Sequence, residues 1–274
     1  MSFYPLFNIL DNKGFLSLPN FPPNNWEIDN TKDQFIHILR RNKDSWEVKN
    51  LGEIKAGNFS DFSVDDFSKD YFKQSKTNDM ITSELVLLEL RSDILEGRFS
   101  ELVKRTEALT SWPDWRATVG FSSDDYKVSY QGEINPFPPQ GSLLTFHPFV
   151  QLEAEANNFF IFVNIEKNPK LRWVDIDIFL SQSKKKVATH KIRNNCANII
   201  PLDSYAFEPN DLPVFSCQNM TGIPFGFAKG TKSSMMSLEH THPPGSFSLY
   251  GNRHLVQKTI KSSWIKDLYL KIQC

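Results

Sequence analysis

Apolar and polar residues alternate through most of the second half of the chain, in the pattern typical of β-strands. In RWVDIDIFL (172–180), the aliphatic residues fall on one face of an extended chain, whereas Asp175 and Asp177 fall on the other. NFFIFV (158–163) is apolar on both faces, which is typical of a central strand that is covered from two sides. Together with the predicted hairpin WRATVGFS/DYKVSYQGEI, these runs predict a β-sandwich or jelly-roll-like core over residues 112–243.

Helical spacing of apolar residues is found in fewer places. Residues 34–46 predict a short helix or an irregular packed segment, and residues 94–103 fit an amphipathic helix. Residues 252–272 predict a C-terminal helix that lies on the core. ELVLLEL (84–90) is consistent with either a helix or a buried strand. The predicted fold class is therefore α+β, with a predominantly antiparallel β core, an N-terminal mixed region and a C-terminal helix.

The length of 274 residues suffices for one large β-rich domain or two small ones. The segment LPNFPPNNW (18–26) is rich in proline and asparagine, which is typical of a loop. We expect residues 1–111 to form an N-terminal arm and a mixed helical region that packs on the core. We expect residues 112–274 to form the β-sandwich-like domain with its helix.

Composition narrows the classes of partner. The 23 phenylalanines and 16 prolines support a β-rich fold. The 31 basic and 32 acidic residues give no basic surface for nucleic acid or for an anionic membrane, so neither is an expected partner. No apolar run approaches the roughly 18 residues that a membrane-spanning helix needs. Three scattered cysteines and the absence of a signal-peptide pattern favour a cytoplasmic setting.

The run SLEHTHPPGSFSLYG (237–251) carries the most distinctive chemistry in the chain. The prolines that follow His242 favour an extended backbone there. On an extended chain, His240 and His242 lie on one face with Leu238, whereas Glu239 lies on the other. Such an H-x-H pair suits a divalent metal such as zinc. A further ligand would come from elsewhere in the chain, and the available side chains are His147, His190, His254, Asp175 and Asp177.

The four residues HTHP overlap the H-x-H-P part of the JAMM metalloprotease motif. In that motif a serine and an aspartate follow at fixed positions, which here are occupied by Tyr250 and Arg253. The β-rich pattern around the run also differs from the alternation of helix and strand that the motif implies. The chain is therefore not assigned to that family.

Two further segments carry candidate ligand-binding residues. In WPDWR, Trp112, Trp115 and Arg116 suit a stacking platform for a sugar ring or another planar ligand, or else pack as core. Downstream, Tyr130, Glu133 and His147 surround a proline-rich loop and mix polar and aromatic chemistry. That mixture is typical of carbohydrate or peptide sites, and equally of a long packed connection.

These observations predict a β-rich binding or accessory protein. Its ligand would be a small polar molecule or a glycan, bound in a polar and aromatic groove near His240 and His242. The alternative is a metal-dependent hydrolase that uses the same two histidines as metal ligands. Because the sequence contains neither a P-loop nor a G-x-S-x-G elbow, it names no reaction and leaves enzymatic activity, cofactor and oligomeric state open.

Overall fold

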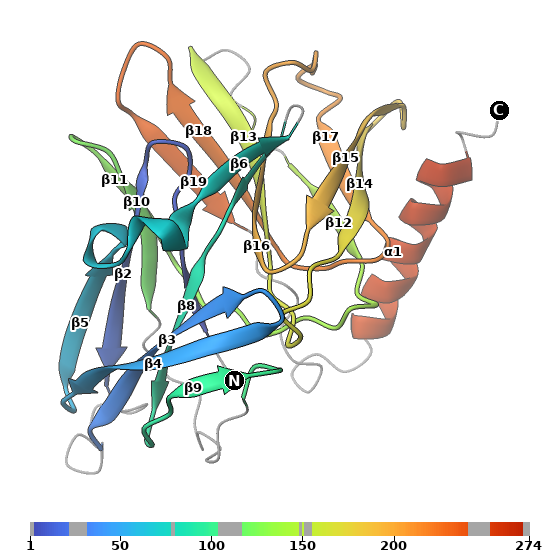
Figure 1. Ribbon diagram of the computed structural model, residues 1–274. Helices are drawn as coiled ribbons and strands as arrows, with labels where there is room; N and C mark the ends of the chain where they lie inside the picture. The colour runs from blue at the N-terminus through green and yellow to red at the C-terminus, as the bar shows by residue number, and fades with distance from the viewer. Residues whose placement is uncertain are drawn as a thin grey trace. The chain divides into compact units, whose positions relative to one another are not determined.

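A computed structural model shows a chain built mostly of antiparallel β-strands, with one helix near its C-terminal end (Figure 1). The structure describes residues 3–21, 32–77, 80–103, 117–147, 150, 155–240 and 253–270, with side chains of the helix from residue 259 onward. Contacts divide the chain into two compact units. Unit 1 comprises residues 1–136, 165–171 and 195–197, and unit 2 comprises residues 137–164, 172–194 and 198–274.

Unit 1 contains two antiparallel sheets. The first has the order β1 (Tyr4–Leu6), β8 (Val86–Arg91), β3 (Gln34–Asn42), β4 (Ser45–Ile54) and β9 (Gly97–Phe99). The second has the order β11 (Lys127–Gln131), β10 (Thr118–Ser122), β2 (Lys13–Asn20) and β5 (Asn58–Ser63). The hairpin β6 (Gln74–Thr77) and β7 (Met80–Ser83) and the 3-10 helices η2 (Val64–Asp66) and η3 (Lys69–Phe72) complete this unit.

The prediction of a short helix or an irregular packed segment over residues 34–46 is wrong, because this segment forms β3, a tight turn and the start of β4. Lys43 adopts a positive φ of 54°, which allows a two-residue turn between strands paired at Asn42 and Ser45. Four consecutive residues of β3 are buried, since both faces of this strand are covered. A strand that is covered on both faces is apolar throughout, so its sequence lacks the alternation of a half-buried strand. Its apolar residues can then also match the spacing of a helix.

The helix predicted over residues 94–103, all of which the structure describes, is also absent. Gly97 has a φ of 129°, a conformation outside the helical region, and it begins β9, which pairs with β4. The adjacent ELVLLEL segment supplies the first five residues of β8, a strand whose six residues are all buried. The predicted hairpin of WRATVGFS with DYKVSYQGEI is confirmed as β10 and β11. This hairpin belongs to unit 1, whose first continuous stretch of chain ends at Pro136.

Unit 2 contains a sheet with the order β12 (Leu143–Phe146), β17 (Pro213–Cys217), β14 (Trp173–Leu180) and β15 (Lys186–Arg193). Its second set of strands has the order β19 (Met236–His240), β18 (Ile223–Gly230), β13 (Ala156–Asn164) and β16 (Cys196–Pro201). The first two residues of β16 are grouped with unit 1. Phe160 of β13 stacks on Phe215 of β17, with ring centroids 3.6 Å apart, and so joins the two sheets through their apolar faces.

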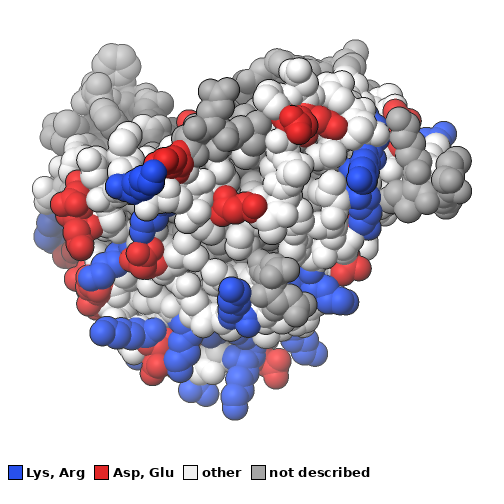
Figure 2. Space-filling model, turned by 90° about the horizontal axis from the view of Figure 1, so that it is seen from above, with Lys and Arg blue, Asp and Glu red and all other residues white. Residues whose placement is uncertain are grey.

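The predicted C-terminal helix is confirmed as α1 (Arg253–Leu270), which packs on the sheet that contains β14 and β17 (Figure 1). Leu268 is fully buried against Phe179 and Val214. Among the described residues, no helix is both long and apolar enough to cross a membrane. In Figure 2, basic and acidic side chains both occur across the visible face, in line with the nearly equal counts of the two charges in the sequence.

Candidate functional site

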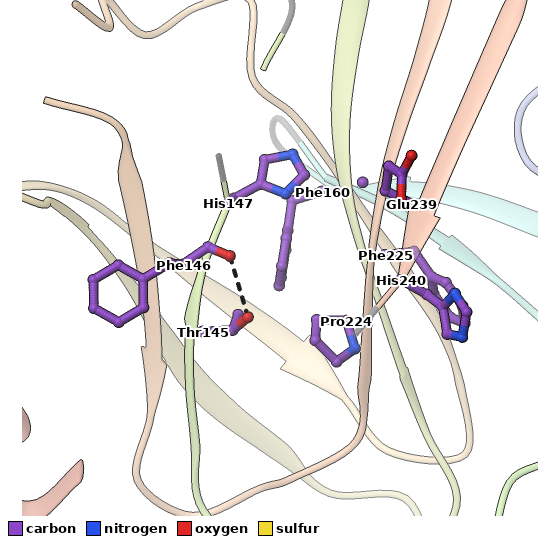
Figure 3. A pocket seen from close by; sticks show the side chains of 9 residues that line it. Thr145, Phe146, His147, Phe160, Pro224, Phe225, Glu239 and His240 are labelled. Carbon is purple, nitrogen blue, oxygen red and sulfur yellow. Dashed lines mark hydrogen bonds between the residues drawn. The ribbon is translucent and has the colours of Figure 1, made fainter. Parts of the chain in front are cut away.

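A small pocket opens in unit 2 where β12 ends beside β18 and β19 (Figure 3). Its cavity volume is about 10 Å³, which is about the space that one water molecule needs. The residues that line it come from β12, β13, β18 and β19 and from the position after β12. They are Thr145, Phe146, His147, Phe160, Pro224, Phe225, Gly226, Glu239 and His240.

His147 forms the buried wall of this pocket, which we call the His147 pocket. It directly follows β12, and its backbone N–H donates to the carbonyl oxygen of Pro213 at 3.0 Å. The imidazole packs edge-on against Phe160 and Phe215 and is only 6% exposed. Because burial disfavours the charged form, the pKa of His147 falls to about 4. The imidazole is therefore neutral at pH 7 and offers one hydrogen-bond donor and one acceptor.

Gly226 of β18 allows His147 to lie this close to the sheet. A Cβ at position 226 would overlap ring carbon Cε1 of His147, so any other residue would push the imidazole away. A glycine inside a strand often marks such a close approach. Two features thus fix the position of the ring: the backbone hydrogen bond from His147 to Pro213, and the absence of a side chain at position 226.

The neighbouring strand β19 places Glu239 and His240 on opposite faces. Gly226 is paired directly with Glu239, and Phe225 is paired with His240. Directly paired residues share a face of the sheet, and a Cβ at Gly226 would point at His147. Glu239 therefore lies on the same side of the sheet as His147, as Figure 3 shows. His240 instead stacks on Phe225, with ring centroids 6.2 Å apart. The predicted alternation along this strand is correct, and it is Glu239 that shares the face of His147.

The other sequence-predicted site residues fall into two groups. Trp112, Trp115, Arg116 and His242 lie outside the described residues. Tyr130 and Glu133 lie in unit 1, where Tyr130 is buried on β11 and Glu133 is partly exposed. Burial raises the pKa of the Tyr130 hydroxyl, so this group stays protonated at neutral pH. Ligand binding by these six residues stays a prediction.

A metal centre receives no support from the described residues, which contain no group of three or more His, Cys, Asp or Glu side chains placed to hold one ion. Two of the ligands considered from the sequence have other partners. His190 hydrogen-bonds to the hydroxyl of Tyr205 at 2.6 Å. Asp177 accepts hydrogen bonds from Thr189 and from Tyr269 Oη, and it forms an ion pair with Lys186. The side chain of His254 lies outside the described residues.

Sequence reasoning did not identify Thr145, Phe146, Phe160 or Gly226 as site residues, and it assigned Glu239 to no site. Gly226 alone carried a usable signal, because an isolated glycine in the apolar strand IPFGFA indicates close approach of another group. The phenylalanines are indistinguishable from core residues in a chain with 23 of them. Comparison with family models, with curated proteins and with solved structures found no match to this chain.

Proposed function

We propose that this chain is a binding protein for a hydroxyl-bearing ligand of the glycan class, held at the His147 pocket. The observation that carries the proposal is the buried neutral imidazole fixed over Gly226, with the Glu239 carboxylate on the same face. A neutral imidazole both donates and accepts a hydrogen bond, and a carboxylate accepts strongly. A sugar hydroxyl, which also donates and accepts, complements both groups.

The aromatic lining of the pocket supports the same class of ligand. Phe160 of β13 adds an aromatic ring beside His147, whereas the ring of Phe146 points away from the cavity (Figure 3). Aromatic rings next to a few oriented polar groups are typical of small-molecule sites. With a cavity of about 10 Å³, a single hydroxyl group would enter while the body of the ligand lies outside the pocket. The proposal includes a β-sandwich or jelly-roll arrangement of unit 2 and a cytoplasmic location.

A glycan panel tests this proposal on the full-length protein and three variants. Gly226→Ala fills the space under His147, and Glu239→Gln removes the carboxylate while preserving its shape. Glu208→Gln is the matched control, since it removes the same charge from an exposed position of unit 2 outside the pocket lining. We expect the first two variants to weaken binding at least tenfold and the control to bind as the wild type does. Binding that is absent from all four proteins, or equal in all four, contradicts the proposal.

The second candidate is a metal-dependent hydrolase that uses His240 and His242, and the H-x-H spacing is its support. Elemental analysis of untagged protein, before and after incubation with zinc, manganese and iron, tests it directly. Stoichiometric metal that is lost in a His240→Ala variant would favour the hydrolase over the binding protein. Protein that neither contains nor takes up metal would eliminate the hydrolase.

A further inference from the structure

We propose that the outer face of the sheet β11–β10–β2–β5 in unit 1 is a second carbohydrate-binding surface, which takes a straight, uncharged oligosaccharide chain. This outer sheet face consists of the odd-numbered residues of β2, β5 and β11 and the even-numbered residues of β10. None of these residues lines the His147 pocket, so the inference does not rest on the proposed function.

Strand pairing separates the two faces of this sheet, whose strands lie side by side in Figure 1. Ser17 pairs with Asp61 on one side and with Thr118 on the other, so these residues share the outer face. On this face only Gly120 is buried, and every other residue is partly or fully exposed. The inward residues of β2 and β10 are at most 1% exposed and include Leu16, Leu18, Val119 and Phe121.

Aromatic rings stand at two positions on the outer sheet face. The ring of Phe15 lies across Gly120 of the neighbouring strand, where a Cβ would overlap the ring. The missing side chain thus allows this ring to lie over the sheet, and Lys127 Nζ is 5.5 Å from its centroid. Phe59 is 60% exposed and contacts Phe21, with ring centroids 4.8 Å apart. Exposed aromatic rings of this kind can stack on the apolar face of a sugar ring.

A row of polar side chains crosses the sheet between the two aromatic positions. Direct pairing aligns four residues across the four strands, in the order Gln131, Thr118, Ser17 and Asp61. Within the described parts of the chain, these four side chains make no hydrogen bond or ion pair. Their amide, hydroxyl and carboxylate groups include both donors and acceptors, which complement the hydroxyl groups of a sugar.

The spacing of the rings requires a ligand longer than one sugar unit. Phe15 stands two residues before Ser17 on β2, and Pro19, which pairs with Phe59, stands two residues after it. The two aromatic positions are therefore about 13 Å apart along the strand, at about 3.3 Å per residue. A chain of several sugar units spans this distance and places its middle over the polar row. A straight chain such as a β-1,4-linked glucan fits an open sheet better than a coiled α-1,4-linked chain does.

Charge and area favour this occupant over a macromolecule. The outer sheet face carries only Lys13, Lys127 and Asp61 as charged residues, and Lys13 forms an ion pair with Asp65 at 2.7 Å. It therefore offers no row of cations for a phosphate backbone. Four strands, of which β10 has five residues, give a face of about 14 Å by about 17 Å, or about 240 Å². A stable protein interface buries about 800 Å² on each partner, so this face alone is too small for one.

Isothermal titration calorimetry of the full chain with cellohexaose tests the inference, with maltohexaose as the coiled counterpart. Cellohexaose should bind the wild type, and maltohexaose should bind about tenfold more weakly or not at all. Phe15→Ala and Phe59→Ala should each weaken cellohexaose binding about tenfold. Thr118→Val should weaken it several-fold, because it removes one hydroxyl and keeps the branched shape. Trp173→Ala is the matched control, since it removes a ring that is 49% exposed in unit 2, and it should bind as the wild type does.

Phe59→Ala keeps the test decisive if Phe15→Ala fails to fold, because the Phe59 ring is largely in solvent. A wild type that does not bind cellohexaose overturns the inference. Equal affinity in the wild type and in Phe59→Ala overturns it as well. An equal loss in Trp173→Ala overturns it too, because binding would then not depend on this face.

The pocket variants separate this surface from the His147 pocket. Cellohexaose binding that is lost in Gly226→Ala but kept in Phe59→Ala overturns the inference and supports the proposed function. Binding that is lost in Phe59→Ala but unchanged in Gly226→Ala and Glu239→Gln supports the outer sheet face. If, in addition, no glycan of the panel is affected by the two pocket variants, the proposed function is refuted while this inference stands.

Discussion

Acid should destabilise this protein through His147 at pH values between about 4 and 6.5. In the folded protein the pKa of this imidazole is about 4, whereas the ordinary value for an exposed histidine is 6.5. Between these values the unfolded chain binds a proton that the folded chain does not, so stability increases with pH. At about 1.4 kcal/mol per pH unit, the full contribution is on the order of 3 kcal/mol. It is present above pH 6.5 and is lost as the pH falls towards 4.

Urea unfolding of the wild type and of His147→Phe at several pH values tests this reasoning. Phenylalanine keeps an aromatic ring beside Phe160 and Phe215 but removes the titration. Between pH 7 and pH 4.5, the free energy of unfolding should fall by about 2 to 3 kcal/mol more in the wild type than in the variant.

His37 of unit 1 titrates in the same direction, because burial and the nearby Arg91 lower its pKa. Its contribution is common to the wild type and to His147→Phe, so it cancels in the comparison. Parallel pH profiles for the two proteins would refute the assignment of this acid sensitivity to His147.

Three further substitutions test buried contacts by urea unfolding. Gly226→Ala should cost about 1 to 3 kcal/mol through overpacking, and a cost below about 0.5 kcal/mol would mean that the imidazole moves freely. Arg91→Met should cost about 3 to 5 kcal/mol, because it leaves the buried carboxylate of Glu89, which is 1% exposed, without its ion pair. The double variant Arg91→Met/Glu89→Leu should recover much of this loss, because no buried charge then remains unpaired. Tyr269→Phe should cost about 1 to 2 kcal/mol by removing a hydrogen bond to the Asp177 carboxylate, and a free energy of unfolding equal to that of the wild type would contradict that bond.

The sequence predicted the strands of unit 2 well, because alternation and apolar runs report directly on which faces are buried. NFFIFV is confirmed as part of β13, whose last seven residues are buried. The helix predicted over residues 34–46 failed for the same physical reason, since a strand covered on both faces has no alternation to display. The turn at Lys43 carries no glycine or asparagine at its positive-φ position, so the usual turn signal is missing there.

The candidate site was predictable in location but not in composition. Alternation along Met236–His240 is enough to separate Glu239 from His240, and the pairing with β18 confirms this separation. Which of the two faces of β19 lies toward His147 depends on how β12 packs against β18, a strand of another sheet, and periodicity does not encode that packing. The surface that α1 covers, which includes Phe179 and Val214, likewise cannot be read from helical spacing, which reveals only that one side of the helix is apolar.

Strands β12 and β19, which border the His147 pocket, each stand at the end of the strand order of their sheet. Among the described strands, β12 pairs only with β17 and β19 only with β18. Outer strands separate by breaking one ladder of hydrogen bonds, whereas an inner strand such as β14 must break two. Amide hydrogens of β12 and β19 should therefore exchange with deuterium before those of β14. Two walls of this pocket are thus outer strands, whose positions can change without disturbing the central strands of unit 2.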